Sequence, residues 1–118
     1  RDSGFAYEQQ AQRFLSSHGL RLVEKNYRCR GGEIDLIMRE QETLVFVEVR
    51  YRKSGRYGNA AESVTVQKQR KIIHCAQCYL QTKPALQTMP ARFDVVAVAP
   101  TAKSSGKVDF HWYRNAFQ

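Results

Sequence analysis

The sequence has no long run of apolar residues. Its longest strictly apolar segment covers residues 95–99, whereas a membrane-spanning helix needs about 20 consecutive apolar residues. The first four residues, Arg-Asp-Ser-Gly, are not followed by an apolar core, so we expect no secretory signal in this chain. A removed leader stays an open alternative, because the chain begins without Met. The sequence therefore predicts a protein with no membrane segment and no membrane partner.

Cysteine is scarce, with three residues in 118. Secreted domains that depend on disulfides usually have an even number of cysteines in a shorter chain, so this count predicts a reducing compartment, the cytoplasm. Cys75 and Cys78 follow His74 in a C-x-x-C pattern, but zinc sites usually need four ligands and the sequence has no second pair. We therefore predict that Cys75 and Cys78 pack within a helix, in preference to a metal or redox role.

Acidic residues are also few, at 11 against 19 basic ones, which gives a net charge of +8. Most of this excess lies in residues 50–71, which hold seven basic side chains and one acidic one. A basic domain of this kind is typical of proteins that bind a polyanion, most often nucleic acid. A basic protein without such a partner, or one that contacts anionic lipid, is the alternative on composition alone.

The length of 118 residues and the hydrophobic share of 42% fit one globular domain over residues 1–118. Apolar spacing predicts an α/β protein in the order α-β-β-β-α-β-β. Its third strand, second helix and fourth strand are long enough to form a parallel crossover. Helices are expected at residues 5–18 and 65–81, and strands at 20–29, 33–38, 44–50, 93–99 and 108–114.

The second and third strands are predicted to pair as a hairpin around residues 41 and 42. Paired residue numbers then sum to 83, which places six apolar side chains on one face. The other face pairs Asp35 with Glu48 and Glu33 with Arg50. Adjacent carboxylates repel, so either one is protonated or a hard cation such as Mg²⁺ or Mn²⁺ lies between them. A Glu33–Arg50 ion pair beside a partly exposed Asp35 is the structural alternative.

These residues carry a resemblance to known families. Asp35 followed by Glu48-Val49-Arg50 resembles the Asp…Glu-x-Lys signature of restriction-endonuclease-like nucleases. More narrowly, residues 32–37 and 45–52 resemble the YraN-like family of small proteins, and further matches extend over nearly the whole chain. The chain is also similar to archaeal Holliday-junction resolvases, which have a Glu on the first helix.

The resemblance implies a restriction-endonuclease-like mixed β-sheet flanked by helices. It also implies that Glu8, Asp35 and Glu48 hold a Mg²⁺ or Mn²⁺ ion with the backbone carbonyl of Val49. Arg50 stands where most members of the nuclease superfamily have Lys. Because Arg is effectively never deprotonated, it can stabilise phosphate charge but cannot act as a base.

The sequence therefore predicts a metal-dependent endonuclease-like protein that hydrolyses phosphodiester bonds in DNA, with branched or damaged DNA among the candidates. Its catalytic residues would be Asp35, Glu48 and Arg50. A nucleic-acid-binding module on a nuclease scaffold, without useful catalysis, is the alternative, and a protein-binding adaptor is a third. RNA as the substrate and a homodimer both stay open. The side chains expected to bind the nucleic-acid backbone are Arg28, Arg30, Arg52, Lys53, Lys68 and Lys71.

Overall fold

The computed structural model describes residues 2–52, 64–101 and 106–118, and it confirms the predicted order of helices and strands. A short 3₁₀ helix, η1 (Pro84–Leu86), is added before the fourth strand. No helix in the described part of the chain is long and apolar enough to cross a membrane. The main elements are α1 (Asp2–Ser17), β1 (Arg21–Cys29), β2 (Gly32–Glu40), β3 (Thr43–Tyr51), α2 (Val66–Gln81), β4 (Ala91–Pro100) and β5 (Val108–Phe117).

The five strands form one mixed sheet in the order β1-β2-β3-β4-β5. The pairs β1–β2, β2–β3 and β4–β5 are antiparallel, and β3–β4 is parallel. The parallel pair is connected through α2 and η1, as the predicted crossover requires. The mixed α/β fold class is thereby confirmed.

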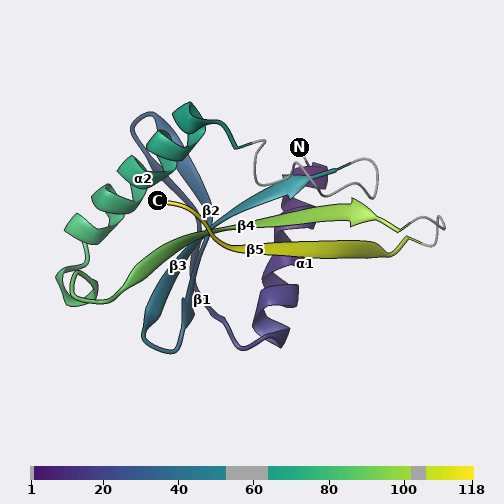
Figure 1. The fold of residues 1–118 in the computed structure, drawn as a ribbon, viewed down its shortest axis with the longest axis horizontal. Helices are drawn as coiled ribbons and strands as arrows, with labels where there is room; N and C mark the ends of the chain where they lie inside the picture. Colours follow the sequence, from purple (N-terminus) through teal and green to yellow (C-terminus); the bar gives the residue numbers. More distant parts are fainter. Residues whose placement is uncertain (1, 53–63, 102–105) are drawn as a thin grey trace.

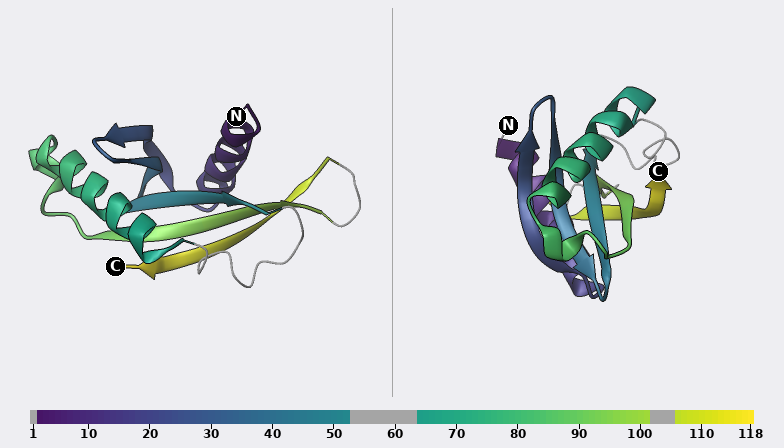
Figure 2. Two further views of the ribbon diagram at one scale, coloured as in Figure 1. Left: turned by 90° about the horizontal axis from the view of Figure 1, so that it is seen from above. Right: turned by 90° about the vertical axis from the view of Figure 1, so that its left-hand side faces the viewer.

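The two helices cover opposite faces of the twisted sheet (Figures 1 and 2). Successive strand residues such as Val95 and Val96 belong to different cores, because neighbouring side chains in a strand point to opposite faces. The core beneath α1, called the α1 core, contains Ala11, Leu15, Leu20, Leu36, Met38, Val45, Val47, Val96 and Val98. The core beneath α2, called the α2 core, includes Ile34, Ile37, Leu44, Phe46, Ile72, Cys75, Ala76, Tyr79 and Val95.

The N-terminus of α2 is fixed by a side-chain cap. Thr65 has an extended backbone, and its Oγ1 accepts a hydrogen bond from the Lys68 backbone N–H at 3.1 Å. This bond satisfies one of the N–H groups that the first helical turn leaves without a partner. The cap therefore fixes where the first turn of α2 begins, and with it the backbone of Lys68.

The predicted hairpin register is confirmed from Leu36 to Glu40, where paired numbers sum to 83. The hairpin turn has only two residues, and Gln41 adopts a positive φ of 53° in it. The prediction is wrong for Ile34, which belongs to the α2 core and not to the face of Leu36 and Met38. The strict alternation of β2 therefore breaks between Ile34 and Leu36, at Asp35.

A disulfide joins Cys29 at the end of β1 to Cys75 in α2. Cys75 is buried in the α2 core, as the helix-packing prediction expects, but its bond to Cys29 was not predicted. The odd count leaves Cys78 as the free thiol. The disulfide removes the support that the cysteine count gave to a reducing compartment, and the cytoplasmic location stays a prediction.

Candidate functional site

Four carboxylates from three elements gather where β2 and β3 separate. Glu8 comes from α1, Glu33 and Asp35 from β2, and Glu48 from β3. One carboxylate oxygen each of Glu8, Glu33 and Asp35 lies within 4.8 Å of the other two. Glu48 is buried, and it interacts electrostatically with Asp35. We call these four residues the acid cluster.

Asp35 occupies this position because its side chain, in place of a backbone carbonyl of β2, accepts a hydrogen bond from β3. The paired register between β2 and β3 runs only as far as Leu36 and Val47. Beyond that point the Asp35 Oδ2 accepts a hydrogen bond from the Val49 backbone N–H at 2.8 Å. Asp35 therefore lies near Glu48, as predicted. The two residues are not, however, paired directly across β2 and β3, as the predicted register requires. The side chain of Asp35 instead bonds to the backbone of the strand opposite.

The surroundings of Asp35 disfavour its ionised form. The pKa of its carboxyl is raised to about 9. Burial is the largest cause, and the negative charges of Glu48 and Glu8 also contribute. The Val49 N–H opposes this change in pKa. Without a cation, Asp35 therefore holds a proton at neutral pH. The several carboxylate oxygens suit Mg²⁺ or Mn²⁺, so the residues present fit such an ion.

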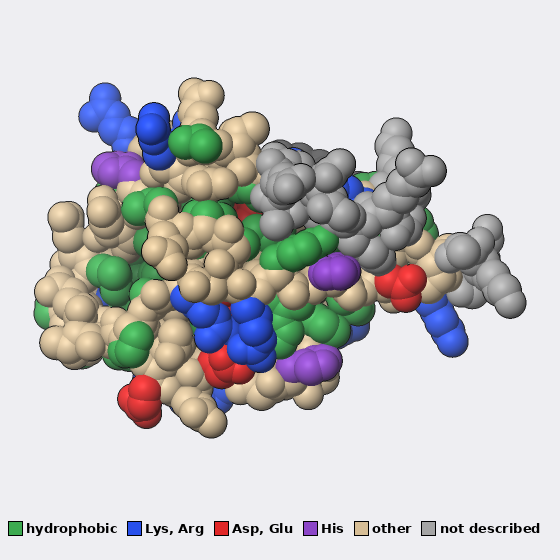
Figure 3. Space-filling view, in the orientation of Figure 1, with side chains coloured by type: hydrophobic (Ala, Val, Ile, Leu, Met, Phe, Trp, Pro, Cys, Tyr) green, Lys and Arg blue, Asp and Glu red, His purple; other side chains and the backbone are tan. Residues whose placement is uncertain are grey.

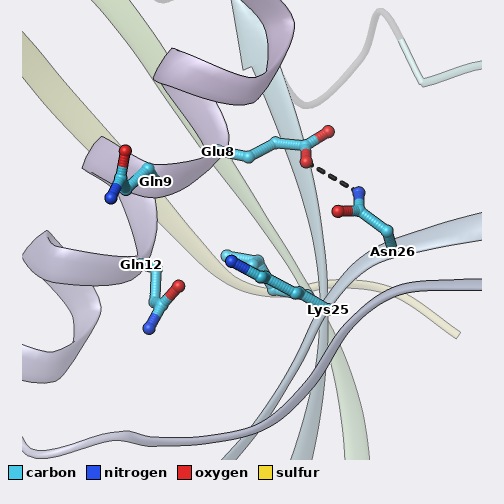
Figure 4. Close-up of a pocket in the computed structure, with 6 residues that line it drawn as sticks. Glu8, Gln9, Gln12, Lys25 and Asn26 are labelled. Carbon is cyan, nitrogen blue, oxygen red and sulfur yellow. Dashed lines mark hydrogen bonds between the residues drawn. The ribbon is translucent and has the colours of Figure 1, made fainter.

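Asn26, on β1, donates hydrogen bonds to two carboxylates of the acid cluster. Its backbone has a positive φ of 53°, and its Nδ2 donates to Glu8 Oε1 at 2.7 Å and to Glu33 Oε2 at 3.4 Å. Figure 4 shows Asn26 turned toward Glu8 across a pocket of about 130 Å³, with Gln12 and Lys25 on its wall. Asn26 thus orients the carboxylate that the resemblance places among the metal ligands.

Sequence reasoning missed Asn26 and Glu33 as members of this site. Glu33 was paired with Arg50 in the structural alternative, but its cationic neighbour is Arg28, with 3.9 Å between Arg28 Nε and Glu33 Oε1. A signal for Asn26 existed, because Asn is uncommon within strands and tolerates a positive φ. The sequence holds no comparable signal for Glu33, because the position of its side chain depends on the interrupted alternation of β2 at Asp35.

Two cations border the acid cluster at Glu48. Glu48 Oε2 lies 3.5 Å from Arg50 Nη1 and 3.7 Å from Lys68 Nζ. Arg50 stands two residues beyond Glu48 on β3, as predicted, and Lys68 comes from the first turn of α2. Lys68 was predicted to contact the nucleic-acid backbone, and the structure places its ammonium group beside a candidate metal ligand.

Four of the predicted contact residues lie around the start of β2 and the first turns of α2. A Cβ atom added at Gly32 would lie 3.3 Å from the carbonyl oxygen of Lys71, so this helix packs closely on the start of β2. Arg28 and Arg30 lie just before that point and are exposed. Figure 3 shows Lys and Arg side chains projecting at the upper left of this face, where Figure 1 draws the turn between β1 and β2 together with α2. The predicted contact residues Arg28, Arg30, Lys68 and Lys71 thus share one region.

The remaining predicted contact residues lie at the end of β3. Arg52 is partly buried, and its backbone N–H donates to the Val98 carbonyl at 2.8 Å. Lys53 lies outside the described residues. Tyr51 stacks on Tyr7, with 4.3 Å between ring centroids, directly beside Arg50 and Glu8 in the sequence. This aromatic pair therefore connects α1 to the end of β3, and Tyr7 covers one face of Tyr51.

Asp94 belongs to a separate network. It is fully buried and accepts hydrogen bonds from the Arg92 Nε at 3.0 Å, the Trp112 Nε1 at 2.9 Å and the Asn115 backbone N–H at 2.8 Å. Arg92 in turn contacts Glu40 through Nη1 at 2.9 Å. Buried polar groups with this many partners are typical of structural cores. We therefore assign Asp94 a structural role.

A mixed sheet with a helix on each face and an acid cluster at the strand divergence defines an α/β protein with a candidate metal site. The model of the "Uncharacterised protein family UPF0102" matches residues 7–98, and the chain belongs to this family. The chain is 48% identical over 118 residues to a UPF0102 protein of Nitrosococcus oceani, covering 100% of this chain and 93% of the relative.

Two further relatives have similar coverage. A UPF0102 protein of Hahella chejuensis is 50% identical over 116 residues, which are 98% of this chain and 90% of the relative. The UPF0102 protein YraN of Salmonella arizonae is 48% identical over 118 residues, which are 99% of this chain and 85% of the relative. The predicted membership of the YraN-like family is thereby confirmed.

Proposed function

We propose that this protein is a metal-dependent nuclease that hydrolyses phosphodiester bonds in DNA. The observation that carries the proposal is the acid cluster, whose Glu48 lies beside the cationic groups of Arg50 and Lys68. Carboxylates and cations in contact suit a reaction in which metal and phosphate meet at one place. The resemblance to restriction-endonuclease-like nucleases and archaeal resolvases supports the same chemistry.

Glu8, Asp35 and Glu48 would hold a Mg²⁺ or Mn²⁺ ion, with the Val49 carbonyl as a further ligand by resemblance. The ion, when bound, would polarise the phosphate and lower the pKa of a bound water. Asn26 keeps Glu8 turned toward the cluster through its 2.7 Å hydrogen bond. The Val49 N–H keeps Asp35 in place in the same way. These two hydrogen bonds support the proposal, because they would hold two of the proposed ligands in position before an ion binds.

Arg50 and Lys68 would together have the role that one Lys has in the nucleases whose signature this chain resembles. Arg50 stays charged and would stabilise the negative charge that develops on the phosphate. Lys68 has a compact ammonium group with three hydrogen-bond donors, which could bind a phosphate oxygen or the attacking water. Its distance of 3.7 Å from Glu48 supports a place for it at the site.

DNA would be held by the exposed basic side chains around α2. Arg28, Arg30 and Lys71 lie near one another at the start of β2 and along the helix. Such contacts bind phosphates without regard to sequence, so they would position the duplex and not select a base order. Branched or damaged DNA stays within this proposal, as does a second copy of the chain as partner.

The alternative is a nucleic-acid-binding protein with weak or no catalysis. Arg50 favours this alternative, because it stands where the nuclease signature has Lys and cannot give up its proton. Both functions share the basic surface and the metal site. They differ only in whether the bound strand is cut.

A cleavage assay separates the two functions. Duplex, nicked, flapped and four-way DNA are incubated with excess protein and Mg²⁺ or Mn²⁺, with EDTA as one control and Asp35→Asn as the other. Cleavage that EDTA and Asp35→Asn both abolish supports the nuclease. Binding without cleavage supports the alternative. Cleavage that persists in Asp35→Asn contradicts the assignment of the acid cluster.

A further inference from the structure

Sulfur and imidazole donors gather where the end of β1 meets α2, apart from the acid cluster. Cys29 comes from β1, while His74, Cys75 and Cys78 come from α2. His74 is exposed, Cys29 and Cys78 are partly buried, and Cys75 is buried. The sequence shows only the C-x-x-C pair and His74 as neighbours, and the fold adds Cys29 from 46 residues away.

The distances among these side chains suit one ion. The Sγ atoms of Cys29 and Cys78 and a ring nitrogen of His74 all lie within 4.8 Å of one another. His74 Nε2 is 3.6 Å from Cys78 Sγ. Neighbouring ligand atoms in a tetrahedral zinc site are about 3.5 to 3.8 Å apart, given its usual Zn–S and Zn–N lengths. His74 and Cys78 already have this spacing, because residues four apart share a helix face.

Cys75 supplies the fourth donor. The disulfide brings its Sγ beside that of Cys29. Once that bond is reduced, both cysteines are thiols at the same location, and the set becomes three cysteines and one histidine. Four protein ligands of this kind are typical of structural zinc sites, which have no open position for substrate.

We propose that the reduced protein binds one zinc ion through Cys29, His74, Cys75 and Cys78. The disulfide and the zinc ion are then alternative ways of tying β1 to α2. Two electrons from a thiol or phosphine reductant, with two protons from the reducing thiols or from water, convert the Cys29–Cys75 disulfide into two thiols. Zinc then displaces one proton from each of three thiols to solvent, while neutral His74 binds through a ring nitrogen.

The donor types separate this site from the acid cluster. Thiolate and imidazole ligands favour zinc, whereas carboxylate oxygens favour Mg²⁺ and Mn²⁺. Each site can therefore be examined with an ion that the other binds poorly. The zinc proposal is also independent of nuclease activity, since none of its ligands belongs to the acid cluster.

The test uses the whole protein and Co²⁺ as a visible substitute for zinc. A water-soluble phosphine reduces the disulfide: phosphorus takes the oxygen of a water molecule, and each sulfur gains one hydrogen. After the phosphine is removed without air, Co²⁺ is titrated and then displaced with Zn²⁺. Sulfur ligation is read from the thiolate-to-cobalt charge-transfer band. The variants are Cys78→Ser and His74→Gln, with His18→Gln, in the turn after α1, as the matched histidine control.

We expect the reduced parent to bind one Co²⁺ per chain with a charge-transfer band, and Zn²⁺ to abolish the band. Cys78→Ser and His74→Gln should each lower zinc affinity by about a hundredfold or more, since each removes a ligand. His18→Gln should match the parent, and the oxidised parent should give no band. Neither test variant alters a core side chain, and circular dichroism confirms folding before titration. A reduced parent without the band, or both variants binding as the parent does, would overturn the proposal.

Discussion

At the scale of single residues, Asp35 is where the fold and the proposed function conflict most. Its carboxyl lies beside Glu8 and Glu48, and burial with their charges raises its pKa to about 9. A carboxyl in an unfolded chain has a pKa of about 3.9. Between these two pKa values the folded state keeps the Asp35 proton, whereas the unfolded state has lost it. The stability of the fold therefore falls as the pH rises through this range.

Asp35→Asn should remove this pH dependence. Asn keeps an oxygen that can accept the Val49 N–H but carries no charge to repel its neighbours. With EDTA present, we expect the variant to melt at or above the temperature of the parent. The Tm of the parent should fall more steeply between about pH 5 and pH 9, as thermal denaturation at several pH values can show. A variant that melts well below the parent would mean that Asp35 holds the fold together.

Arg50 and Lys68 can be tested together in single-turnover cleavage. Arg50→Ala and Lys68→Ala should each slow cleavage by roughly a hundredfold, or about 3 kcal/mol of barrier, as for the loss of one electrostatic donor. Arg50→Lys keeps the charge and should retain or raise activity. Arg70→Ala removes a positive charge elsewhere on α2 and is the matched control. Unchanged cleavage in Arg50→Ala would show that another group, or a contaminating nuclease, is responsible.

At the scale of the elements, the close approach of α2 to β2 depends on Gly32. A Cβ atom there would lie 3.2 Å from Cys75 Sγ and 3.3 Å from the Lys71 carbonyl oxygen. The Lys71 carbonyl oxygen belongs to the backbone of α2, which cannot move aside as the end of a flexible side chain can. Gly32→Ala should therefore lower the free energy of unfolding by about 1 to 3 kcal/mol, the usual cost of overpacking.

Urea denaturation measures this cost. Gly31 is the informative comparison, because a Cβ there meets nothing within 4 Å but its φ is +88°. Asn tolerates a positive φ better than most residues with a side chain, so Gly31→Asn should cost less than Gly32→Ala. Equal urea midpoints for Gly32→Ala and the parent would mean that α2 shifts freely and that the contact does not fix its position.

The elements also show what the sequence could predict. The register of β2 and β3 followed from alternation, because a shift of one residue would expose the apolar side chains. The break at Asp35 did not, since it arises when a side chain takes the Val49 N–H in place of the ladder. The contacts of Lys68 with Glu48 and of Cys29 with Cys75 were also hidden, because each depends on how α2 lies across the sheet.

At the scale of the whole molecule, the net charge of +8 should control binding to DNA. Four to six phosphate contacts would give a slope of about −4 to −5 for log K against log salt on duplex DNA. Lys71→Ala should flatten this slope by about one unit, whereas Glu42→Gln, on the hairpin turn, should leave it unchanged. Fluorescence anisotropy over a range of salt concentrations measures this slope. A slope near zero in the parent would exclude an electrostatic nucleic-acid interface.

The central claim is that the acid cluster is a divalent-metal site, and a Mn²⁺ titration followed by electron paramagnetic resonance tests it most directly. The parent should bind Mn²⁺ with one high-affinity site per chain, because hard carboxylate oxygens suit this ion and thiolates do not. Glu8→Gln and Asp35→Asn should each weaken binding by at least about tenfold, and Glu42→Gln should bind as the parent does. Binding that is absent in the parent, or equal in all four proteins, would contradict the account.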